Sequence, residues 1–176
     1  MSYKIVSRDT HVHVDKPDLR CVLEQHHAAS FGWALACCGR DREEAEDVLQ
    51  ASYLKILEGR ARFDGRSSVK TWLFGIIRRT AAEERRRSRV RRRMHDSHAT
   101  EAPLTYSSDD AIGDDPLVTA LALLAPRQQE VLHLVFYQGL TIEDAARVMR
   151  VSVGTARTHY ERGKQRLRVH LRQAMP

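Results

Sequence analysis

Residues 140–168 read LTIEDAARVMRVSVGTARTHYERGKQRLR, and this stretch decides the fold of the second half of the chain. Thr141 and Ser152 each precede a run in which apolar residues recur at three and four residues, as in an amphipathic helix. Thr and Ser are also preferred helix N-caps. The pattern therefore predicts two short helices joined by a tight turn, an arrangement that small proteins commonly use to place side chains in a DNA groove.

The second of these helices has two contrasting faces. One face is small or apolar and consists of Val153, Ala156, Tyr160, Gly163 and Leu167. The opposite face is polar and consists of Thr155, Arg157, Thr158, Glu161, Arg162 and Gln165. Guanidinium groups and hydroxyls on a rigid helix suit base edges and phosphates in the major groove. The alternative interpretation is the solvated, charged face of a small bundle.

The rest of the C-terminal half also reads as helices. The run PLVTALALLA (116–125) is short and apolar, and Pro126 opens a further helix that Gly139 ends. Its expected buried residues are Val131, Leu132, Leu134 and Val135. Thr141 then caps a helix with Ile142, Ala145, Ala146, Val148 and Met149 in the core. Four helices with short connections leave room for only a small core.

The N-terminal half predicts three or four helices. The spacing of apolar residues favours one helix over 18–38, a second that Asp41 caps at its N-terminus and Gly59 ends, and a third from about Lys70 into the arginine-rich run. The expected core residues are Leu19, Val22, Leu23, His26, Ala29, Ser30, Trp33, Cys37, Ala45, Val48, Leu49, Ser52, Tyr53, Ile56, Leu57, Trp72, Leu73, Ile76, Ile77, Thr80 and Ala81. Since no strand pattern interrupts these helices, we expect an all-α fold of two small helical domains.

Charge divides the chain. Thirteen Lys or Arg residues lie between Arg60 and Arg93 against three carboxylates, whereas residues 101–115 carry five carboxylates and no cation. That acidic run is typical of a linker, because Pro, Ser and Gly accompany it without periodicity. We therefore expect an N-terminal extension (1–17), a helical domain (18–93), a flexible acidic linker (94–115) and a second helical domain (116–176).

Composition bounds the function. The net charge of +6 and a pI near 9.5 allow a polyanionic partner. No apolar run approaches the roughly 18 residues of a membrane span, and the N-terminus lacks the apolar core of a secretory signal. An odd set of three cysteines argues against a disulfide framework. We expect a cytoplasmic protein without membrane insertion, cofactor or resident metal.

The basic block of residues 78–93 differs from the basic face of the last predicted helix. The run RRTAAEERRRSRVRRR (78–93) follows a loop that contains Phe63 and a helix that contains Trp72. Cations that neutralise a backbone, next to aromatic rings on which an unstacked base can lie, are typical of single-strand binding. A nonspecific polyanion arm or a solvated helix end is the open alternative. Two separate basic surfaces favour a protein that binds DNA while the DNA is being melted.

Three segments carry a family resemblance. DREEAEDVLQASYLKIL (41–57), FDGRSSVKTWLFGIIRR (63–79) and LALLAPRQQEVLHLVFYQGLTIEDAARVMRVSVGTARTHYERGKQRLR (121–168) resemble the extracytoplasmic-function group of bacterial sigma factors. The resemblance covers roughly residues 19–171. It implies a dissociable subunit of bacterial core RNA polymerase that directs the enzyme to promoters, opens the strands and has no enzymatic activity itself. It also implies a sigma region 2-like and a region 4-like domain.

The resemblance also implies three sets of contact residues. Those for core polymerase are Asp47, Gln50 and Leu54, which lie away from the Val48 and Leu49 stripe. Those for the flipped base and single strand of the −10 element are Phe63, Asp64, Ser67, Ser68, Lys70, Trp72, Arg78 and Arg79. Those for the major groove of the −35 element are Thr155, Arg157, Thr158, Glu161, Arg162 and Lys164. Trp72 has a competing role as a core residue.

Three positions depart from the family pattern. Arg79 stands where the family usually has an Asn that helps to hold the flipped base, so the −10 preference is expected to differ. Arg150 occupies a turn position where Gly is frequent, which implies a modest strain at positive φ. Ala156 replaces a usual Val or Ile.

Two other classes of function fit parts of the sequence. A metal or redox sensor would use Cys21, Cys37, Cys38, His26 and His27, with His11 and His13 of the extension. Cys37 and His26 are more than about 15 Å apart along one helix at 1.5 Å per residue, so one helix cannot close that site. A helix-turn-helix regulator that acts without polymerase explains residues 141–168 but gives the 41–57 and 79–93 segments no role. The family resemblance further implies an anti-sigma factor as a partner.

Overall fold

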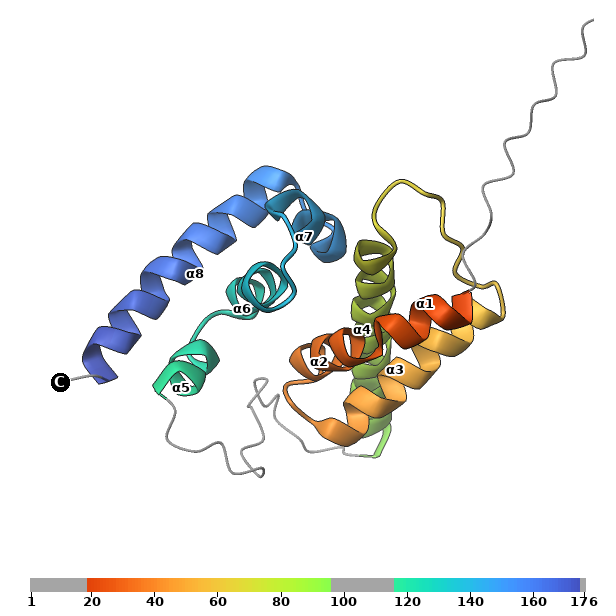
Figure 1. The fold of residues 1–176 in the computed structure, drawn as a ribbon. Coiled ribbons are helices and arrows are strands. Elements are labelled where there is room, and N and C mark those ends of the chain that lie inside the picture. The colour runs from red at the N-terminus through yellow and green to blue at the C-terminus, as the bar shows by residue number, and fades with distance from the viewer. Residues whose placement is uncertain (1–18, 96–115, 175–176) are drawn as a thin grey trace, which may run out of the picture.

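The computed structural model describes residues 19–95 and 116–174, and every regular element in these two ranges is a helix (Figure 1). The elements are α1 (Leu19–Gln25), α2 (His27–Cys37), α3 (Arg42–Leu57), α4 (Val69–His95), α5 (Pro116–Ala122), α6 (Pro126–Leu132), the π-helical turn η1 (His133–Tyr137), α7 (Ile142–Met149) and α8 (Val153–Ala174). The expectation of an all-α fold with two small helical domains is confirmed. The extension and the predicted linker lie outside the described residues, apart from the end of α4.

The N-terminal domain packs α1 to α4 around Trp33. This indole is fully buried, donates its Nε1–H to the carbonyl of Phe74 at 3.0 Å, and stacks on the Phe74 ring at 6.0 Å between centroids. Five residues of the predicted α3 stripe are buried, Tyr53 is partly buried, and Leu57 is 48% exposed; the buried five are Ala45, Val48, Leu49, Ser52 and Ile56. Phe74, which the periodicity did not select, is fully buried. The third predicted helix therefore contributes a wider apolar face than expected.

The predicted first helix is broken at His26. The backbone of His26 has φ −99° and ψ 5°, and α1 and α2 lie on either side of it. The Tyr53 hydroxyl of α3 lies 3.5 Å from the carbonyl oxygen of Leu23, the acceptor that an unbroken helix would offer to the N–H of His27. A hydroxyl near that carbonyl can compete with the helical hydrogen bond, and the break occurs at this point without a Gly or Pro.

The predicted helix caps are confirmed. Asp41 accepts from the N–H of Glu44 at 2.9 Å, and the Thr141 and Ser152 hydroxyls accept from the N–H groups of Asp144 and Thr155 at 3.1 Å each. Each bond satisfies one donor that a helix N-terminus leaves unpaired. The caps fix where α3, α7 and α8 begin.

Two backbone positions shape the C-terminal domain. Gly139 at φ 65° ends η1, as the sequence predicts for a helix stop. Arg150 at φ 56° and ψ 47° is the left-handed residue of the turn between α7 and α8, where the sequence indicates a strained position. The turn directs α8 across α6 and α7 (Figure 1).

The two domains pack on each other. One continuous cluster of buried residues joins Leu73, Phe74 and Ile77 of α4 to Val131, Leu134 and Met149 of the C-terminal helices. Helix α7 lies beside α4, and η1 contacts α2 (Figure 1). In the part of the chain that the structure describes, no helix is long and apolar enough to cross a membrane.

Candidate nucleic-acid and partner interfaces

The outer face of α3 is open. Asp47, Gln50 and Leu54 are all exposed, and Leu54 presents 53% of its surface although it is a large apolar residue. Spacings of three and four residues align these side chains along one side of the helix, while Val48 and Leu49 point into the core. The face is a polar stripe that ends on an exposed leucine.

This face borders a groove of about 520 Å³ between α3 and α4. The charged and polar residues of its lining are Asp41, Glu43, Glu44, Asp47, Gln50, Glu84, Ser88 and Arg91. Five carboxylates line the groove against one cation, Arg91, so the groove suits a partner that brings basic side chains. The exposed Leu54 at the end of this face offers an apolar contact. The acidic groove and the apolar contact together favour a protein partner over a nucleic acid.

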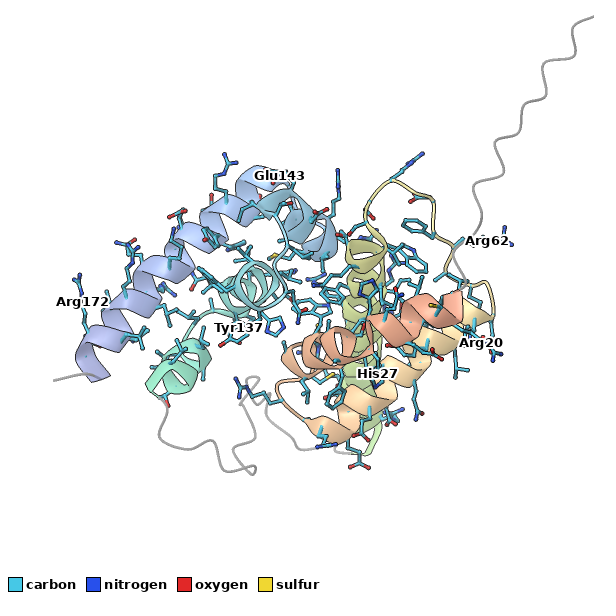
Figure 2. The ribbon with its side chains drawn as sticks, viewed as in Figure 1. Arg20, His27, Arg62, Tyr137, Glu143 and Arg172 are labelled. Carbon is cyan, nitrogen blue, oxygen red and sulfur yellow. The ribbon has the colours of Figure 1, made fainter. Side chains whose placement is uncertain are left out.

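The loop before α4 is built on Trp72. The indole Nε1–H donates to the carbonyl of Arg62 at 3.2 Å, and the ring of Phe63 meets Trp72 edge-on at 5.4 Å between centroids. Trp72 is only partly buried, so it supports the loop and still contributes exposed surface. Arg62 lies on the side of the molecule that faces away from the C-terminal helices (Figure 2).

The polar residues of this loop organise its backbone. Asp64 accepts from the N–H of Arg66 at 3.1 Å across Gly65, which has φ 73°. Ser68 Oγ accepts from the N–H of Thr71 at 3.1 Å and so caps α4, and Ser67 Oγ donates to the carbonyl of Ser68 at 3.2 Å. Phe63 and Ser67 are partly buried, while Asp64 and Ser68 are exposed. The structure brings these predicted strand-binding residues together on one loop.

The predicted strand-binding cations of α4 are not equivalent. Arg79 is exposed. Lys70 Nζ donates to the carbonyl of Gln138 at 2.6 Å and lies 5.5 Å from the centre of the Phe74 ring. Arg78 pairs with Glu130 through Nε–Oε1 at 3.2 Å and Nη2–Oε2 at 3.3 Å, with side-chain exposures of 15% and 19%. Two of the three cations are therefore engaged by the C-terminal domain.

Burial shifts the pKa values of two groups at the junction, which is the contact of α6 and η1 with α2 and α4. It raises the pKa of Glu130, and the nearby Arg127 guanidinium opposes that effect. It lowers the pKa of His133 to about 4, with Arg40 adding to the shift, so this imidazole is neutral at pH 7. His133 lies 5.4 Å from Trp33 and 5.3 Å from Tyr137 between ring centroids. A neutral ring thus fills the space between the two domains.

The polar face of α8 is accessible. Thr155, Arg157, Thr158, Glu161 and Arg162 are exposed, and Lys164 is partly buried. Arg172 of the last turn points away from the other helices (Figure 2). The structure therefore places five of the six predicted major-groove residues on exposed positions of one helix, whereas Lys164 lies nearer the packing face, beside Tyr160.

Several of these side chains have local partners. Arg157 lies 3.9 Å from a carboxylate oxygen of Glu143, and Thr158 Oγ1 donates to the carbonyl of Gly154 at 2.9 Å. Lys164 Nζ lies 3.3 Å from Glu161 and 4.7 Å from the centre of the Tyr160 ring. Exposed pairs of this kind contribute little to stability, so they exchange readily for phosphates or base edges.

The opposite side of α8 packs tightly. Ala156 is fully buried, and Gly163 is buried against Leu132 and Gln128 of α6. Tyr160 and Leu167 are partly buried, as the predicted packing face requires. Val153 is 39% exposed, so its assignment to that face was wrong. It occupies the first turn of α8, beyond the region that α6 covers.

The two buried thiols, Cys37 and Cys38, are unsuited to a metal or redox site. Cys37 and Cys38 are buried, Cys21 is exposed, and burial raises the pKa of Cys37 strongly and that of Cys38 to about 12. Thiolates are the reactive and ligating forms, and burial disfavours them here. Within residues 19–95 and 116–174, no three His, Cys, Asp or Glu residues form a potential metal site. His11 and His13 lie outside the described residues.

The residues that join the two domains were not predicted from the sequence. Glu130, His133 and Gln138 contact α2 or α4 although they lie 52 to 109 residues away in the chain. Helical periodicity reports only which face of each helix is apolar, and it carries no signal for which helices pair across domains.

Two family models match this chain, one for each helical domain. Residues 22–93 match the family model for sigma-70 region 2, and residues 114–167 match that for sigma-70 region 4. The ECF RNA polymerase sigma factor SigX of Bacillus subtilis is 30% identical over 141 residues, which cover 75% of this chain and 73% of that protein. The ECF RNA polymerase sigma factor SigC of Mycobacterium tuberculosis is 33% identical over 138 residues, 77% of this chain and 74% of that protein.

Solved structures show the same fold. The sigma factor RpoE of Bartonella quintana, in complex with the anti-sigma factor NepR, superposes with a TM-score of 0.70 at 24% identity over 88% of this chain and 97% of that one. CnrH, in complex with the cytosolic domain of CnrY, gives 0.60 at 18% identity over 88% of each chain. Fold, motif order and sequence similarity agree, and the chain belongs to the extracytoplasmic-function family of RNA polymerase sigma factors.

Proposed function

We propose that this sigma factor uses three separate faces to direct transcription initiation. The outer face of α3 binds core RNA polymerase, the Trp72 loop with the start of α4 binds the opened −10 element, and α8 reads the −35 element. The observation that carries the proposal is the presence of an ordered aromatic loop beside cations in one domain and an exposed, capped recognition helix in the other. A regulator that acts without polymerase needs only the recognition helix, and the similar proteins give that alternative no support.

Contact with core polymerase is assigned to Asp47, Gln50 and Leu54. An exposed leucine beside polar groups is a typical centre for a protein interface, since its burial is favourable and the polar rim provides specificity. The acidic groove next to it adds charge complementarity to a basic partner. These three side chains are exposed and do not pack in the core, which supports a role in binding.

Binding of the −10 element is assigned to the Trp72 loop. Taking a base out of the stack costs a few kcal/mol, so the protein must offset that cost by stacking and by hydrogen bonds. Phe63 and Trp72 supply aromatic surface, and Asp64, Ser67 and Ser68 supply polar groups around it. Arg79, at the usual Asn position, offers donors only, so it favours a base edge or phosphate that accepts.

Reading of the −35 element is assigned to α8. Thr155, Arg157, Thr158, Glu161 and Arg162 project from the first three turns, the part of a recognition helix that reaches base edges, and Lys164 follows at the start of the fourth. Arginines pair best with guanine, and the methyl group of a threonine can contact thymine. The exposed Glu161 can accept from the amino group of cytosine.

Membership of the family supports a proposal for partners and location. The RpoE and CnrH structures contain bound proteins, an anti-sigma factor in the first case. We extend a partner of that class to this chain, with the exposed faces of α3 and α8 as the surfaces it would cover. Action on chromosomal DNA with polymerase implies a cytoplasmic protein, and the assigned residues bind without catalysing a reaction.

Association with core polymerase tests the proposal. Purified core enzyme and the full chain should co-elute in gel filtration, and Leu54→Asp should weaken the complex at least about tenfold, because it places a charge in an apolar contact. Leu123→Asp is the matched control, since Leu123 is 62% exposed on the C-terminal domain. Equal losses for both variants, or no complex with the unaltered chain, would refute the assignment.

A further inference from the structure

Thr158 lies on the exposed polar face of α8 with its hydroxyl already engaged. Thr158 Oγ1 donates to the carbonyl of Gly154 at 2.9 Å, one turn earlier in the same helix. A threonine hydroxyl has a single hydrogen to donate. In this conformation Thr158 therefore has no donor left for a base edge or a phosphate.

Other polar groups of α8 differ from Thr158 in this respect. Thr155 Oγ1 and Ser152 Oγ lie 2.8 Å apart, and either hydroxyl can donate, so the hydrogen of Thr155 is not committed. Arg157 and Arg162 are exposed, and each guanidinium carries five N–H donors. The arginines can therefore donate to bases and phosphates, whereas Thr158 offers its methyl group and its oxygen lone pairs.

The methyl group of Thr158 is the part best placed to meet a base. The hydrogen bond to the preceding turn draws the oxygen towards the helix backbone, which leaves the methyl branch of the β-carbon for the groove. Gly154 presents no side chain on that preceding turn. Among the described residues beyond its chain neighbours and the helix backbone, a β-carbon at position 154 would meet only Ser152 Oγ, at 3.9 Å, so the space there is open.

We infer that Thr158 reads a thymine of the −35 element through contact of its methyl group with the C5-methyl group of the base. This role rests on the proposed reading of the −35 element by α8, and it assigns one base and one pair of methyl groups to one residue. Thymine is the base that presents a methyl group in the major groove. The contact is apolar, so it selects a base without a hydrogen bond.

The engaged hydroxyl also disfavours other bases at this position. Guanine presents two acceptors, O6 and N7, in the major groove, and Thr158 could donate to them only by giving up its bond to Gly154. Adenine and cytosine present amino groups, which the Thr158 oxygen could accept. Reading through the oxygen would therefore favour adenine or cytosine, whereas reading through the methyl group favours thymine.

The position of Arg162 limits where this thymine can lie. Arg162 follows Thr158 by four residues, so the two side chains are neighbours on one side of α8. Four residues span about 6 Å along a helix, and successive bases of a strand are about 3.4 Å apart. The thymine should therefore lie within about two base pairs of the position at which Arg162→Ala alters the sequence preference.

Deletion of the methyl group from the base tests the contact. Holoenzyme assembled from core polymerase and the full chain selects promoters from a library with random −35 elements, and the selected sequence supplies the DNA probe. Each thymine of its −35 motif is then replaced by uracil, which lacks only the C5-methyl group. One replacement should weaken binding about fourfold, the effect of losing one buried methyl group, as measured by competition in fluorescence anisotropy.

Two variants of similar shape separate the methyl group of Thr158 from its hydroxyl. Thr158→Ser keeps the hydroxyl and removes the methyl group, so it should bind the thymine and uracil probes equally. Thr158→Val replaces the hydroxyl by a second methyl group and should keep the preference for thymine. Thr119→Ser is the matched control, because Thr119 is exposed on α5, and it should keep the preference as well. Circular dichroism checks that each variant retains its helices.

The outcomes separate this contact from the proposed function. Selection of promoters without a shared −35 motif would overturn the reading role of α8 and the contact with it. A motif without thymine, or one in which every uracil replacement is neutral, would overturn the methyl contact and leave the proposed function intact.

The variants decide which residue and which group read the base. A thymine preference that persists in Thr158→Ser would place the contact at another residue, and one that disappears in Thr158→Val would show that the hydroxyl reads the base. Either result would overturn the assignment. A preference that Thr158→Ser alone loses supports it.

Discussion

A β-carbon at position 163 would lie only 3.0 Å from Cδ1 of Leu132 and 3.2 Å from Cβ of Gln128. The contact brings the backbone of α8 directly onto α6, and it sets how the recognition helix is presented. Few real β-carbons approach other atoms this closely, so position 163 accepts glycine for reasons of space although glycine costs helix stability.

Gly163→Val should therefore destabilise the protein by about 1–3 kcal/mol, the usual cost of overpacking a tight contact. Thermal or urea unfolding followed by circular dichroism measures the change. Gly75→Ala is the control, because a β-carbon at this helical position meets nothing within 4 Å. It should be neutral or stabilising by up to about 1 kcal/mol. If both variants unfolded like the unaltered chain, α8 would not rest on α6 as described.

Trp72→Phe should make the Trp72 loop less rigid. The change removes the indole N–H that holds the carbonyl of Arg62 at 3.2 Å while keeping an aromatic ring against Phe63. A lost hydrogen bond of this kind costs about 0.5–1.5 kcal/mol. Permanganate reactivity of unpaired thymines in the polymerase–promoter complex should fall, while affinity for the double-stranded −35 element should stay constant. Equal opening by the variant would show that the loop does not depend on this bond.

Arg157→Ala and Arg162→Ala should each weaken binding to the −35 element by about 1–3 kcal/mol if the residue makes a bidentate base contact. The loss should concentrate at particular base pairs, because base contacts specify sequence and phosphate contacts do not. Fluorescence anisotropy with a set of single-base variants of the promoter measures both effects. Arg172→Ala, in the last turn and away from the assigned face, should change the affinity less. Unaltered binding by both test variants would show that α8 is not the reading helix.

Stability should fall in mild acid because of His133. Histidine in an unfolded chain titrates near pH 6.5, whereas burial holds the pKa of His133 at about 4 in the folded protein. Between these two values the unfolded state takes up a proton that the folded state does not, so stability is present above about pH 6.5 and is lost as the pH falls toward 4. The loss from this residue should reach about 3 kcal/mol.

His133→Phe separates this effect from that of other titrating groups. Phenylalanine can still pack against Trp33 but takes up no proton. Urea unfolding at several pH values should show a smaller loss of stability between pH 6.5 and 4 for the variant than for the unaltered chain. Parallel curves would contradict burial of a neutral imidazole at the junction.

Local features of the fold were predictable from the sequence, because short-range physics fixes them. Asp41, Thr141 and Ser152 cap the helices that they were expected to cap, and Arg150 takes the left-handed turn position. The polar faces of α3 and α8 were predictable for the same reason, since helical periodicity separates exposed from buried positions.

Features that depend on pairing between distant segments were not predictable. The break at His26 coincides with the approach of the Tyr53 hydroxyl, on another helix, to the carbonyl of Leu23. Engagement of Arg78 by Glu130 joins residues 52 positions apart, and that of Lys70 by Gln138 joins residues 68 apart. A single sequence identifies a cation and a carboxylate, but it does not indicate that they meet in a buried junction.

Transcription by purified core polymerase tests the central claim most directly. Core enzyme should be incubated with the full chain and a library of promoters with random −35 and −10 elements, and the 5′ ends of the transcripts should be sequenced. We predict initiation from a subset that shares two sequence motifs at fixed spacing, with Arg162→Ala altering only the upstream motif. Transcripts that neither depend on the chain nor share an upstream sequence would contradict its assignment as a promoter-selecting subunit.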